Sequence, residues 1–465
     1  MKAIAKYFDF EGRGTTYGTE FRAGMTTFMT MAYIIIVNPI IISASGMPMG
    51  AVFTATALLC AVTTLVMGIY AKLPFALAPA MGINAVFAYG IVATGLADWE
   101  TALGIVFIAA VLFMLLSFPL LKPLKWFGLK NEKLTSYTLR RALTDNIPVS
   151  LKFGLAAVIG IFLLGLGFGD NGIGLTTINV GPPAEHVFGD VTSTGVLIGI
   201  VGFLVTAIMF WAKGKLRVPG ALLIGIFFTT ILAIVFGIVP LPEQVISIPP
   251  SMAEISFKLN ILGALRLEYI PFILVFLLGD FLSTVGTTLA CGTKAGLVDK
   301  NGDLPGLDEV YIVDSAAGAV GAAVGITTMT TYVESAAGIE EGGRTGFTSV
   351  VVAFFFFLSL LFSPIFLMIP GMASGVALIV VGLSMMQELR LVDFSNPVHW
   401  VPVLVMVTST AFSMDFASAM CAGIVVYSVF AVLYRYVLKD KSVKVNAMTF
   451  VLFAIGVSQF VLKAL

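Results

Sequence analysis

Long apolar runs alternate with short polar segments along almost the whole chain. A helix needs about 20 apolar residues to cross the hydrocarbon core of a membrane. The pattern therefore predicts an all-α polytopic membrane protein. Its spanning helices are expected near residues 23–44, 51–70, 101–121, 150–168, 194–212, 218–239, 269–290, 310–327, 347–369, 372–387, 398–414 and 417–437. A last apolar run, 446–464, fits either a span or a helix lying along the membrane.

Two further segments, 74–90 and 328–346, are too short or too interrupted to cross the membrane as ordinary helices. Each is the third element of its half of the chain, counted from the start and from the polar stretch 240–268. Seven membrane elements in each half would invert the second half relative to the first. Broken elements at matching places in inverted halves indicate the substrate site of a transporter. The alternative interpretation is that Gly and Pro only interrupt tightly packed helices and do not mark a substrate site.

The distribution of basic residues predicts the orientation. With the N-terminus inside, 23 of the 26 Lys and Arg residues fall on the inner side, as the positive-inside rule requires. The outer loops 91–100 and 169–193 contain acids and no base. Residues 1–22 are polar and charged rather than a cleavable signal peptide, so we predict a cytoplasmic N-terminal segment. We expect a multi-pass protein of the cell (plasma) membrane, with the lipid bilayer around it.

Composition supports this class of protein and excludes others. The chain of 465 residues is 58% hydrophobic and 11% charged, whereas soluble domains have about 25% charged residues. A soluble enzyme, a disordered chain and a nucleic-acid-binding protein are all excluded. Lys plus Arg and Asp plus Glu number 26 each, so net charge indicates no anionic partner. Two His and three widely spaced Cys residues predict neither a metal site nor a cofactor.

Two acidic residues in apolar surroundings stand out. A charged side chain at the centre of a spanning helix costs at least ~2.5 kcal/mol on insertion scales, so each needs a reason. Asp280 and Glu334 both have Thr, Ser and Gly neighbours, which suit close contact with a ligand. The alternative is a structural carboxylate bonded to neighbouring backbone or paired with Arg344. Asp314 is interpreted as structural, as a cap of its helix.

The first broken segment and nearby aromatic residues add complementary chemistry. Gly82 permits close approach, and Asn84 offers both a donor and an acceptor. Tyr33, Phe87 and Tyr332 could stack on a planar ring, although ordinary packing explains each of them singly. Together these groups suit a flat heterocycle that carries both donors and acceptors. Composition alone does not name that heterocycle.

The same residues carry a resemblance to a known family. The chain resembles the AzgA-like branch of the xanthine/uracil permease (nucleobase–cation symporter) superfamily over essentially its whole length. The matching stretches are TTFMTMAYIIIVNP (26–39), LPFALAPAMGINAVFAY (73–89), TTYVESAAGIEEGGRTG (330–346), FSPIFLMIP (362–370) and, more loosely, FLLGDFLSTVGTTLACGTKAGL (276–297). Of these, TTYVESAAGI followed by GGRTG is the most specific.

The resemblance implies about fourteen transmembrane segments in a seven-plus-seven inverted repeat. A core domain would comprise 23–121 (segments 1–4) and 269–369 (segments 8–11). A gate domain would comprise 150–239 (segments 5–7) and 372–465 (segments 12–14 and the last apolar run). The implied activity is proton-coupled import of guanine, hypoxanthine, adenine or xanthine. By motif match, Gly82 and Asn84 correspond to residues of the third segment, and Glu334 to the binding glutamate of the tenth.

One departure from the family concerns the eighth segment. Its usual pattern is Asp-Leu-Phe-Asp-Thr-x-Gly-Thr, whereas this chain reads Asp280-Phe-Leu-Ser283-Thr-Val-Gly-Thr. The first acid is kept and the second is Ser283, so the preferred purine and the mode of coupling stay open. Because residues three apart lie on nearly the same helix face, we expect Asp280 to reach the same cavity.

The sequence therefore predicts a secondary active transporter and not an enzyme. We expect Glu334 to bind ring N–H groups and, with Asp280, to couple transport to the proton. The remaining residues of the predicted substrate site are Asn84, Ser283, Thr331, Tyr33, Gly82, Phe87 and Ser335. An anion transporter or an uncoupled nucleobase facilitator on the same fold is the alternative. Expected partners are a purine nucleobase and a proton, with no nucleic acid; a homodimer is one compatible oligomeric state.

Overall fold

The computed structural model describes residues 2–117, 149–179, 185–212, 218–297, 304–413, 416–440, 443, 445 and 447–464. Helices form most of these residues. The elements of the first half are α1 (Lys2–Tyr7), α2 (Tyr17–Met31), α3 (Ile34–Ser43), α4 (Met49–Val66), η1 (Met67–Ala71), β1 (Leu77–Pro79), α5 (Met81–Ala85), η2 (Val86–Val92), α6 (Trp99–Ser117), α9 (Val149–Phe168), β2 (Thr176–Asn179), β3 (Glu185–Phe188), α10 (Thr194–Trp211) and α11 (Ala221–Val235).

The second half begins with short α12 (Ile261–Ala264) and η5 (Leu267–Tyr269). It continues with α13 (Ile270–Lys294), α14 (Leu307–Val324), β4 (Met329–Thr331), α15 (Ser335–Glu340), α16 (Gly346–Leu361), α17 (Ser363–Leu367), α18 (Gly371–Met386), η6 (Gln387–Leu391), α19 (Pro397–Ser413), α20 (Phe416–Val432), η7 (Leu433–Val437) and α21 (Ala447–Ala464). Each of the predicted spans contains a helix, but parts of some spans, such as 236–239 and 325–327, are not helical. Residues 118–121 and 414 of the predicted spans lie outside the described residues.

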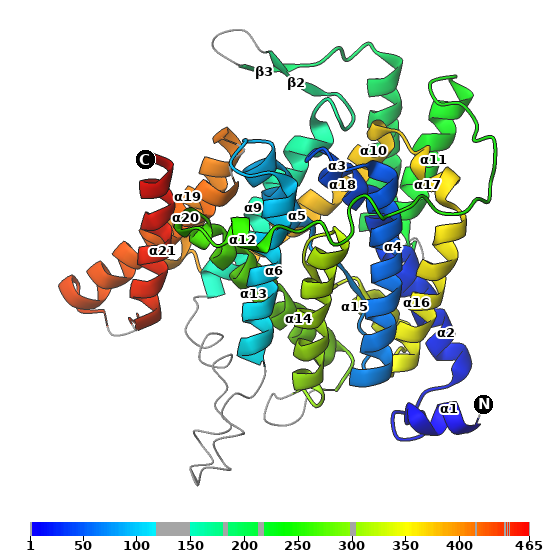
Figure 1. Ribbon diagram of the computed structural model, residues 1–465, viewed down its shortest axis with the longest axis horizontal. Coiled ribbons are helices and arrows are strands. Elements are labelled where there is room, and N and C mark those ends of the chain that lie inside the picture. Colours follow the sequence, from blue (N-terminus) through cyan, green and yellow to red (C-terminus); the bar gives the residue numbers. More distant parts are fainter. Residues whose placement is uncertain are drawn as a thin grey trace.

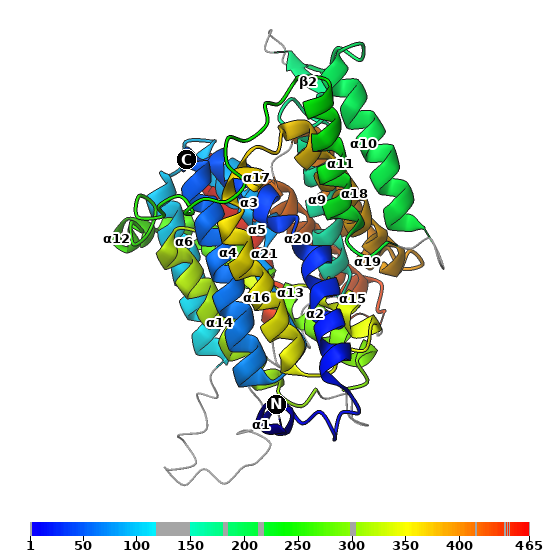
Figure 2. The same ribbon diagram turned by 90° about the vertical axis from the view of Figure 1, so that its right-hand side faces the viewer.

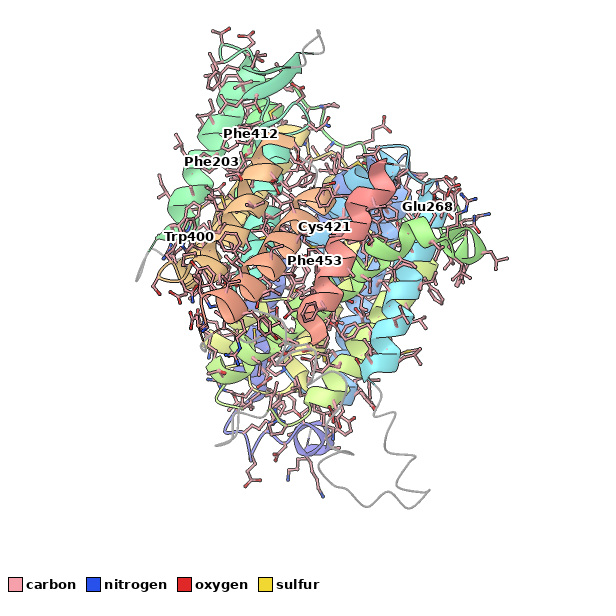
Figure 3. All side chains as sticks on the ribbon, turned by 90° about the vertical axis from the view of Figure 1, so that its left-hand side faces the viewer. Phe203, Glu268, Trp400, Phe412, Cys421 and Phe453 are labelled. Atoms are coloured by element: carbon pink, nitrogen blue, oxygen red, sulfur yellow. The ribbon has the colours of Figure 1, made fainter. Side chains whose placement is uncertain are left out.

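Seven helices among the described residues are long and apolar enough to cross a membrane. Shorter apolar helices include α11, α16 and α19. The outer surface fits this environment, because Phe412 is 87% exposed and Ile208 is 70% exposed. Figure 3 shows Phe412 on α19 and Phe453 on α21, on the face of the molecule turned toward the viewer. The chain is therefore a multi-pass membrane protein.

The two broken segments pair with each other through short strands. β1 and β4 are antiparallel, with Leu77 opposite Thr331 and Pro79 opposite Met329. α14 ends at Gly325, whose φ of +98° favours glycine, and the chain then turns into β4. Backbone polar groups inside a membrane must be satisfied within the protein, and this pairing supplies their partners. The expectation of an all-α protein is corrected here and at the β2–β3 hairpin.

Side chains complete the hydrogen bonding of the first broken segment. The hydroxyl of Thr64 accepts from the Leu77 amide at 2.9 Å and donates to the Leu77 carbonyl at 3.2 Å. The hydroxyl of Ser349 lies 2.9 Å from the carbonyl oxygens of both Leu73 and Phe75. Polar residues on α4 and α16 thus hold a non-helical backbone that the lipid could not solvate.

The helices pack into two groups (Figures 1 and 2). The first helix group contains α2–α6 and α13–α16, in which α6 packs on α14 and α4 on α16. The second helix group contains α9–α11 and α18–α20, in which α18 packs on α9, α10 and α11. α21 lies against α20 and also touches α13. Each group combines helices from both halves of the chain.

Candidate functional site

A cavity of about 620 Å³ lies between the two helix groups, beside the paired strands β1 and β4. From the first helix group its walls include parts of α2, α5, α13, β4 and α15. From the second helix group they include parts of α9, α10, α11, α18 and α20. The cavity is thus made by both groups and by both broken segments.

Glu334 provides the carboxylate of the cavity wall. It stands at the turn between β4 and α15, and its Oε1 accepts a 2.7 Å hydrogen bond from the hydroxyl of Tyr33. Arg344 does not pair with it, because the Arg344 guanidinium donates to the carbonyls of Ile339 and Gly343 at 2.6 and 2.8 Å. The alternative of a Glu334–Arg344 ion pair is therefore wrong. Glu334 keeps acceptor capacity for a ligand in the cavity.

The turn that presents Glu334 is fixed to the first broken segment. The Tyr332 hydroxyl donates to the Pro79 carbonyl at 2.6 Å, and the Tyr332 amide donates to the Ala76 carbonyl at 2.9 Å. The Ser335 hydroxyl accepts from the Ala76 amide at 3.0 Å. Ser335 is fully buried and does not belong to the cavity wall. Its position explains the orientation of its neighbour Glu334.

One face of α13 supplies small polar groups to the cavity. Gly279, Ser283 and Thr287 line it at intervals of four residues, which brings them onto one side of a helix. Thr331, on β4, also lines the cavity, and its hydroxyl has no hydrogen-bond partner among the described residues. Ser283 therefore brings a hydroxyl-bearing side chain to the cavity, whereas the unpartnered Thr331 hydroxyl is buried within the wall.

The second helix group contributes an apolar wall. Leu155 and Ile159 of α9, Phe210 of α10 and Met385 of α18 line the cavity. Ile159 approaches Gly82 so closely that a Cβ on Gly82 would lie 2.3 Å from its Cδ1. Gly82 is thus required by the close approach of the two helix groups as well as by the cavity.

Asn84 belongs to a buried amide network behind the cavity. Its side-chain N–H donates to Asn38 Oδ1, and its own oxygen accepts from the Thr327 hydroxyl. Asn38 in turn donates to the Thr56 hydroxyl at 2.8 Å. Both Asn residues are fully buried. The network joins α3, α4, α5 and the approach to β4, so it positions both broken segments.

Asp280 also lies behind the cavity wall and not on the face that carries Ser283. Its side chain faces α14, where Oδ2 lies 3.6 Å from the position of a Cβ on Gly318. Asp314 does not cap α14, because it lies in the interior of that helix and accepts from Thr284 and from the Thr331 amide. The capping interpretation of Asp314 is therefore wrong, and the expected reach of Asp280 into the cavity is corrected.

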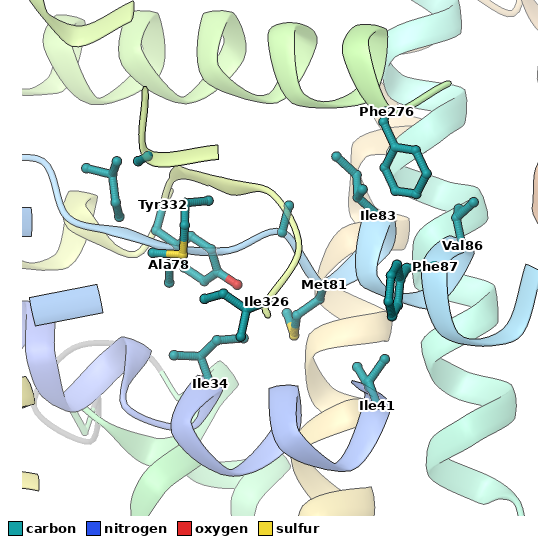
Figure 4. Close-up of a cluster of buried hydrophobic side chains, with 14 of the residues drawn as sticks. Ile34, Ile41, Ala78, Met81, Ile83, Val86, Phe87, Phe276, Ile326 and Tyr332 are labelled. Atoms are coloured by element: carbon teal, nitrogen blue, oxygen red, sulfur yellow. The ribbon is translucent and has the colours of Figure 1, made fainter. Parts of the chain in front are cut away.

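The structure separates the predicted site residues into two sets. Tyr33, Gly82, Ser283, Thr331 and Glu334 line the cavity. The set buried behind the wall comprises Asn84, Asp280, Ser335 and Phe87. Figure 4 shows Phe87 in the buried apolar cluster with Val86 and Ile41.

Sequence reasoning missed several groups that the fold brings to this site. Asn38 is one, although a buried Asn inside the apolar run IIIVNPIII is costly unless paired and could have indicated the network. Thr287 is another, and its spacing of four from Ser283 was the available signal. Nothing in the local pattern identified the apolar wall at Ile159.

Charged side chains occur where the cavity meets solvent. Lys294 forms an ion pair with Glu340, and their side chains are 45% and 31% exposed. Exposed pairs of this kind contribute little to stability. Among the described residues, no group of three or more His, Cys, Asp or Glu could hold a metal ion.

Comparisons with known proteins agree with this architecture. Residues 18–414 match the xanthine/uracil permease group that is described as the Permease family. Permease MJ0326 of Methanocaldococcus jannaschii is 38% identical, over 93% of this chain and 93% of its own. Adenine permease AdeQ of Escherichia coli (strain K12) is 34% identical, over 92% of this chain and 90% of its own. Guanine/hypoxanthine permease PbuG of Bacillus subtilis (strain 168) is 32% identical, over 98% of this chain and 99% of its own.

A solved structure extends the comparison to the fold. The transmembrane domain of the cyanobacterial bicarbonate transporter BicA matches with a TM-score of 0.57, over 87% of this chain and 97% of that one. At 15% identity this likeness shows a shared transporter fold alone. The resemblance to AzgA-like purine permeases is confirmed by the sequence relatives. The chain therefore belongs to the xanthine/uracil permease family, whose named relatives are transporters and not enzymes.

Proposed function

We propose that this protein imports purine nucleobases across the plasma membrane together with protons. The observation that carries the proposal is the Glu334 carboxylate, which lines a cavity between two helix groups and is held by Tyr33. The names of the adenine and guanine/hypoxanthine permease relatives support a purine as the substrate.

A purine matches the cavity, which has a polar wall from the first helix group and an apolar wall from the second. Its ring N–H groups would donate to Glu334, and Ser283 would bond to its heteroatoms. Its apolar faces would lie against Ile159, Phe210 and neighbouring apolar groups. A cavity of about 620 Å³ is within the usual range for small-molecule sites. Asn84, Phe87, Asp280 and Ser335 would support the site from behind its wall.

Transport would occur by alternating access. In this proposal the first helix group is the core domain, the second is the gate domain, and the helices form a seven-plus-seven inverted repeat. The substrate would stay between the paired broken segments while the two domains move, as in other transporters with inverted repeats. With a cytoplasmic N-terminus, Lys294 and Glu340 lie at the inner side, so the cavity faces the cytoplasm.

An anion such as bicarbonate is the competing substrate, because the fold is shared with a bicarbonate transporter. Glu334 in the cavity wall accepts from Tyr33 and has no ion pair among the described residues, so its negative charge opposes an anion. A nucleobase with acidic or amide-like N–H groups uses that acid as an acceptor. The site therefore favours the nucleobase.

The experiment is uptake by proteoliposomes that contain the purified protein. Radiolabelled adenine, guanine, hypoxanthine, xanthine and bicarbonate are offered with an inward proton gradient and with a protonophore. We expect concentrative uptake of at least one purine, which the protonophore abolishes. Equal purine uptake with and without the gradient would identify an uncoupled facilitator, and bicarbonate uptake alone would overturn the proposal.

Glu334→Gln tests the residue that carries the proposal. We expect a loss of purine uptake of at least about tenfold, since a buried charge-assisted hydrogen bond contributes ~1.5–3 kcal/mol. Glu243→Gln, in an exposed loop, is the matched control and keeps wild-type uptake. Full uptake by well-inserted Glu334→Gln would remove Glu334 from the site.

A further inference from the structure

We infer that Asp280 carries the coupling proton, in a buried site separate from the substrate cavity, with Asp314 as its fixed negative neighbour. The inference rests on the proposed function and deepens it. It separates two tasks that the sequence leaves combined on Glu334 and Asp280: substrate binding by one acid, and proton binding by the other.

The hydrogen bonds of Asp314 identify it as the charged member of the pair. Its Oδ1 accepts from the Thr331 amide at 2.8 Å, and its Oδ2 accepts from the Thr284 hydroxyl at 2.6 Å. An ionised carboxylate is an acceptor at both oxygens, and donors to both oxygens favour the ionised form. Asp314 is fully buried, so this arrangement is built into the packing of α13, α14 and β4.

Asp280 has the opposite environment. It is 2% exposed, and neither carboxylate oxygen has a hydrogen-bond partner among the described residues. Its electrostatic neighbours are Asp314 and the hydroxyl of Thr330. An unpartnered buried charge beside a second negative charge is strongly unfavourable. A bound proton neutralises Asp280 and leaves the pair with a single charge.

No basic residue of the described chain offsets this pair. Of the elements packed on α13, α14 contributes Asp314 and, nearer its start, Asp308, Glu309 and Tyr311. η5 contains Glu268 and Tyr269, before the start of α13, and α21 has one basic residue, Lys463, next to its last residue. β4 and α5 contain no ionisable side chain. α6 has only Glu100, in its first turn far along the helix, and α15 has Glu340, paired with Lys294. Glu334 precedes α15 on the cavity wall, bonded to Tyr33. The proton that neutralises Asp280 must therefore come from solution.

The pair is linked to the cavity through β4. The Thr331 amide donates to Asp314, and the same residue lines the cavity. The adjacent Thr330 shares a hydrogen bond with Thr284, which also bonds Asp314. A ligand or a domain movement that displaces β4 would change the donors to Asp314. The negative charge next to Asp280 would then be less stabilised or more stabilised, which changes how tightly Asp280 holds its proton.

In each transport cycle Asp280 binds one proton on the outer side and releases one proton on the inner side. Asp280 in carboxylate form accepts a proton when its site communicates with the outer solution. The neutral acid returns that proton to the inner solution after the substrate has left, and the carboxylate is restored. No bond of the purine is made or broken.

The experiment combines equilibrium purine binding to purified protein with proteoliposome uptake and a pH dye inside the vesicles. In Asp280→Asn we expect binding within about threefold of wild type, retained exchange of labelled for unlabelled purine, and loss of proton-driven accumulation and of inward proton movement. Glu309→Gln, an acid in the first turn of α14, is the control and keeps coupled uptake. Failure of the wild-type protein to bind or move purine would instead refute the proposed function.

Asp314→Asn provides a second variant in case Asp280→Asn fails to fold. Removing the neighbouring charge weakens proton binding at Asp280, so half-maximal coupled uptake should shift by about 1 pH unit or more toward acid. Accumulation by Asp280→Asn with unchanged proton movement, or an unshifted pH profile in folded Asp314→Asn, would overturn the inference. Uptake that follows a sodium gradient and ignores the proton gradient would overturn it as well.

Discussion

Ser283 stands where the family resemblance implies a second acid, and it lies on the cavity-lining face of α13. A serine hydroxyl both donates and accepts, whereas a carboxylate only accepts. Ser283→Asp should therefore change which purines compete for uptake, with a change of at least about tenfold between the best and the poorest competitor. Competition assays with unlabelled adenine, guanine, hypoxanthine and xanthine measure this change. Thr288→Ser, on a buried face of the same helix, serves as the control.

Asn38 illustrates a different role, that of holding the site without touching the substrate. Asn38→Ala leaves Asn84 without its acceptor, and a buried unpaired polar group costs ~1–3 kcal/mol. We expect a lower melting temperature and a several-fold lower uptake rate. The double variant Asn38→Ala/Asn84→Ala should lose less stability than the sum of the single variants, because the two residues share one network. Strictly additive losses of melting temperature would show that they act independently.

The sequence predicted individual site residues better than their surroundings. Glu334 was identified because an ionisable group in an apolar run needs a reason, and Ser283 because the family resemblance implies a second acid at its position. Asp280 was expected in the cavity because it is three positions from Ser283, yet that separation turns it toward α14. The division of one helix into a cavity face and a packing face depends on its neighbours. A single sequence does not show which elements pack on each face of a helix.

Gly82, at the start of α5 in the first helix group, lies close against Ile159 of α9 in the second, where an added Cβ would be 2.3 Å from Ile159 Cδ1. Gly82→Ala would place a methyl group against Ile159 and should slow transport by at least about tenfold. Ile159→Ala removes the obstructing atoms, so the double variant should recover much of the rate. Uptake by the two single variants and the double variant provides the test. Absence of recovery would show that Gly82 is needed for a reason other than this contact.

α2 and α16 are joined by a buried acid near the N-terminal segment. Glu20 accepts from the amides of Arg344 and Thr348 and from the hydroxyls of Thr345 and Thr348, at 2.6 to 3.1 Å. The start of α16 is favourable for an anion. Burial lowers the pKa of nearby Arg13, while Asp9 and Glu20 oppose that shift.

Glu20→Ala should destabilise this connection strongly. Several buried donors lose their acceptor at once, and each costs ~1–3 kcal/mol. We expect poor recovery of folded protein and a melting temperature many degrees below wild type in detergent. Glu11→Ala, on the exposed N-terminal segment, should leave the melting temperature unchanged. A Glu20→Ala protein as stable as wild type would contradict a structural role for this acid.

For helices and strands, the sequence predicted that two elements are broken but not that they form strands. The residues LAP and MTT are too few to show a strand pattern, and they are paired across about 250 intervening residues. Their strand geometry results from the need to satisfy each other's backbone inside the membrane. The pairing is therefore a property of the assembled helices.

For the whole molecule, the proposed orientation can be tested with cysteine labels. The native residues Cys60, Cys291 and Cys421 are all buried, which favours a low background. Asp190→Cys should react with a membrane-impermeant maleimide in intact cells, since the proposed outer loop exposes it. Lys6→Cys should react only after permeabilisation. The reverse pattern would invert the proposed topology.

The β1–β4 pairing also has a consequence for how the protein is made. When Leu77–Pro79 enters the membrane, the strand that will satisfy it has not yet been synthesised. At 5–20 residues per second, Met329–Thr331 follows roughly 12 to 50 s later. During that interval the first broken segment needs a temporary partner, such as water, the insertion machinery or a neighbouring helix. Truncation after residue 297 should therefore yield a product that cellular proteases degrade, whereas co-expression of the missing half as a separate chain should protect it.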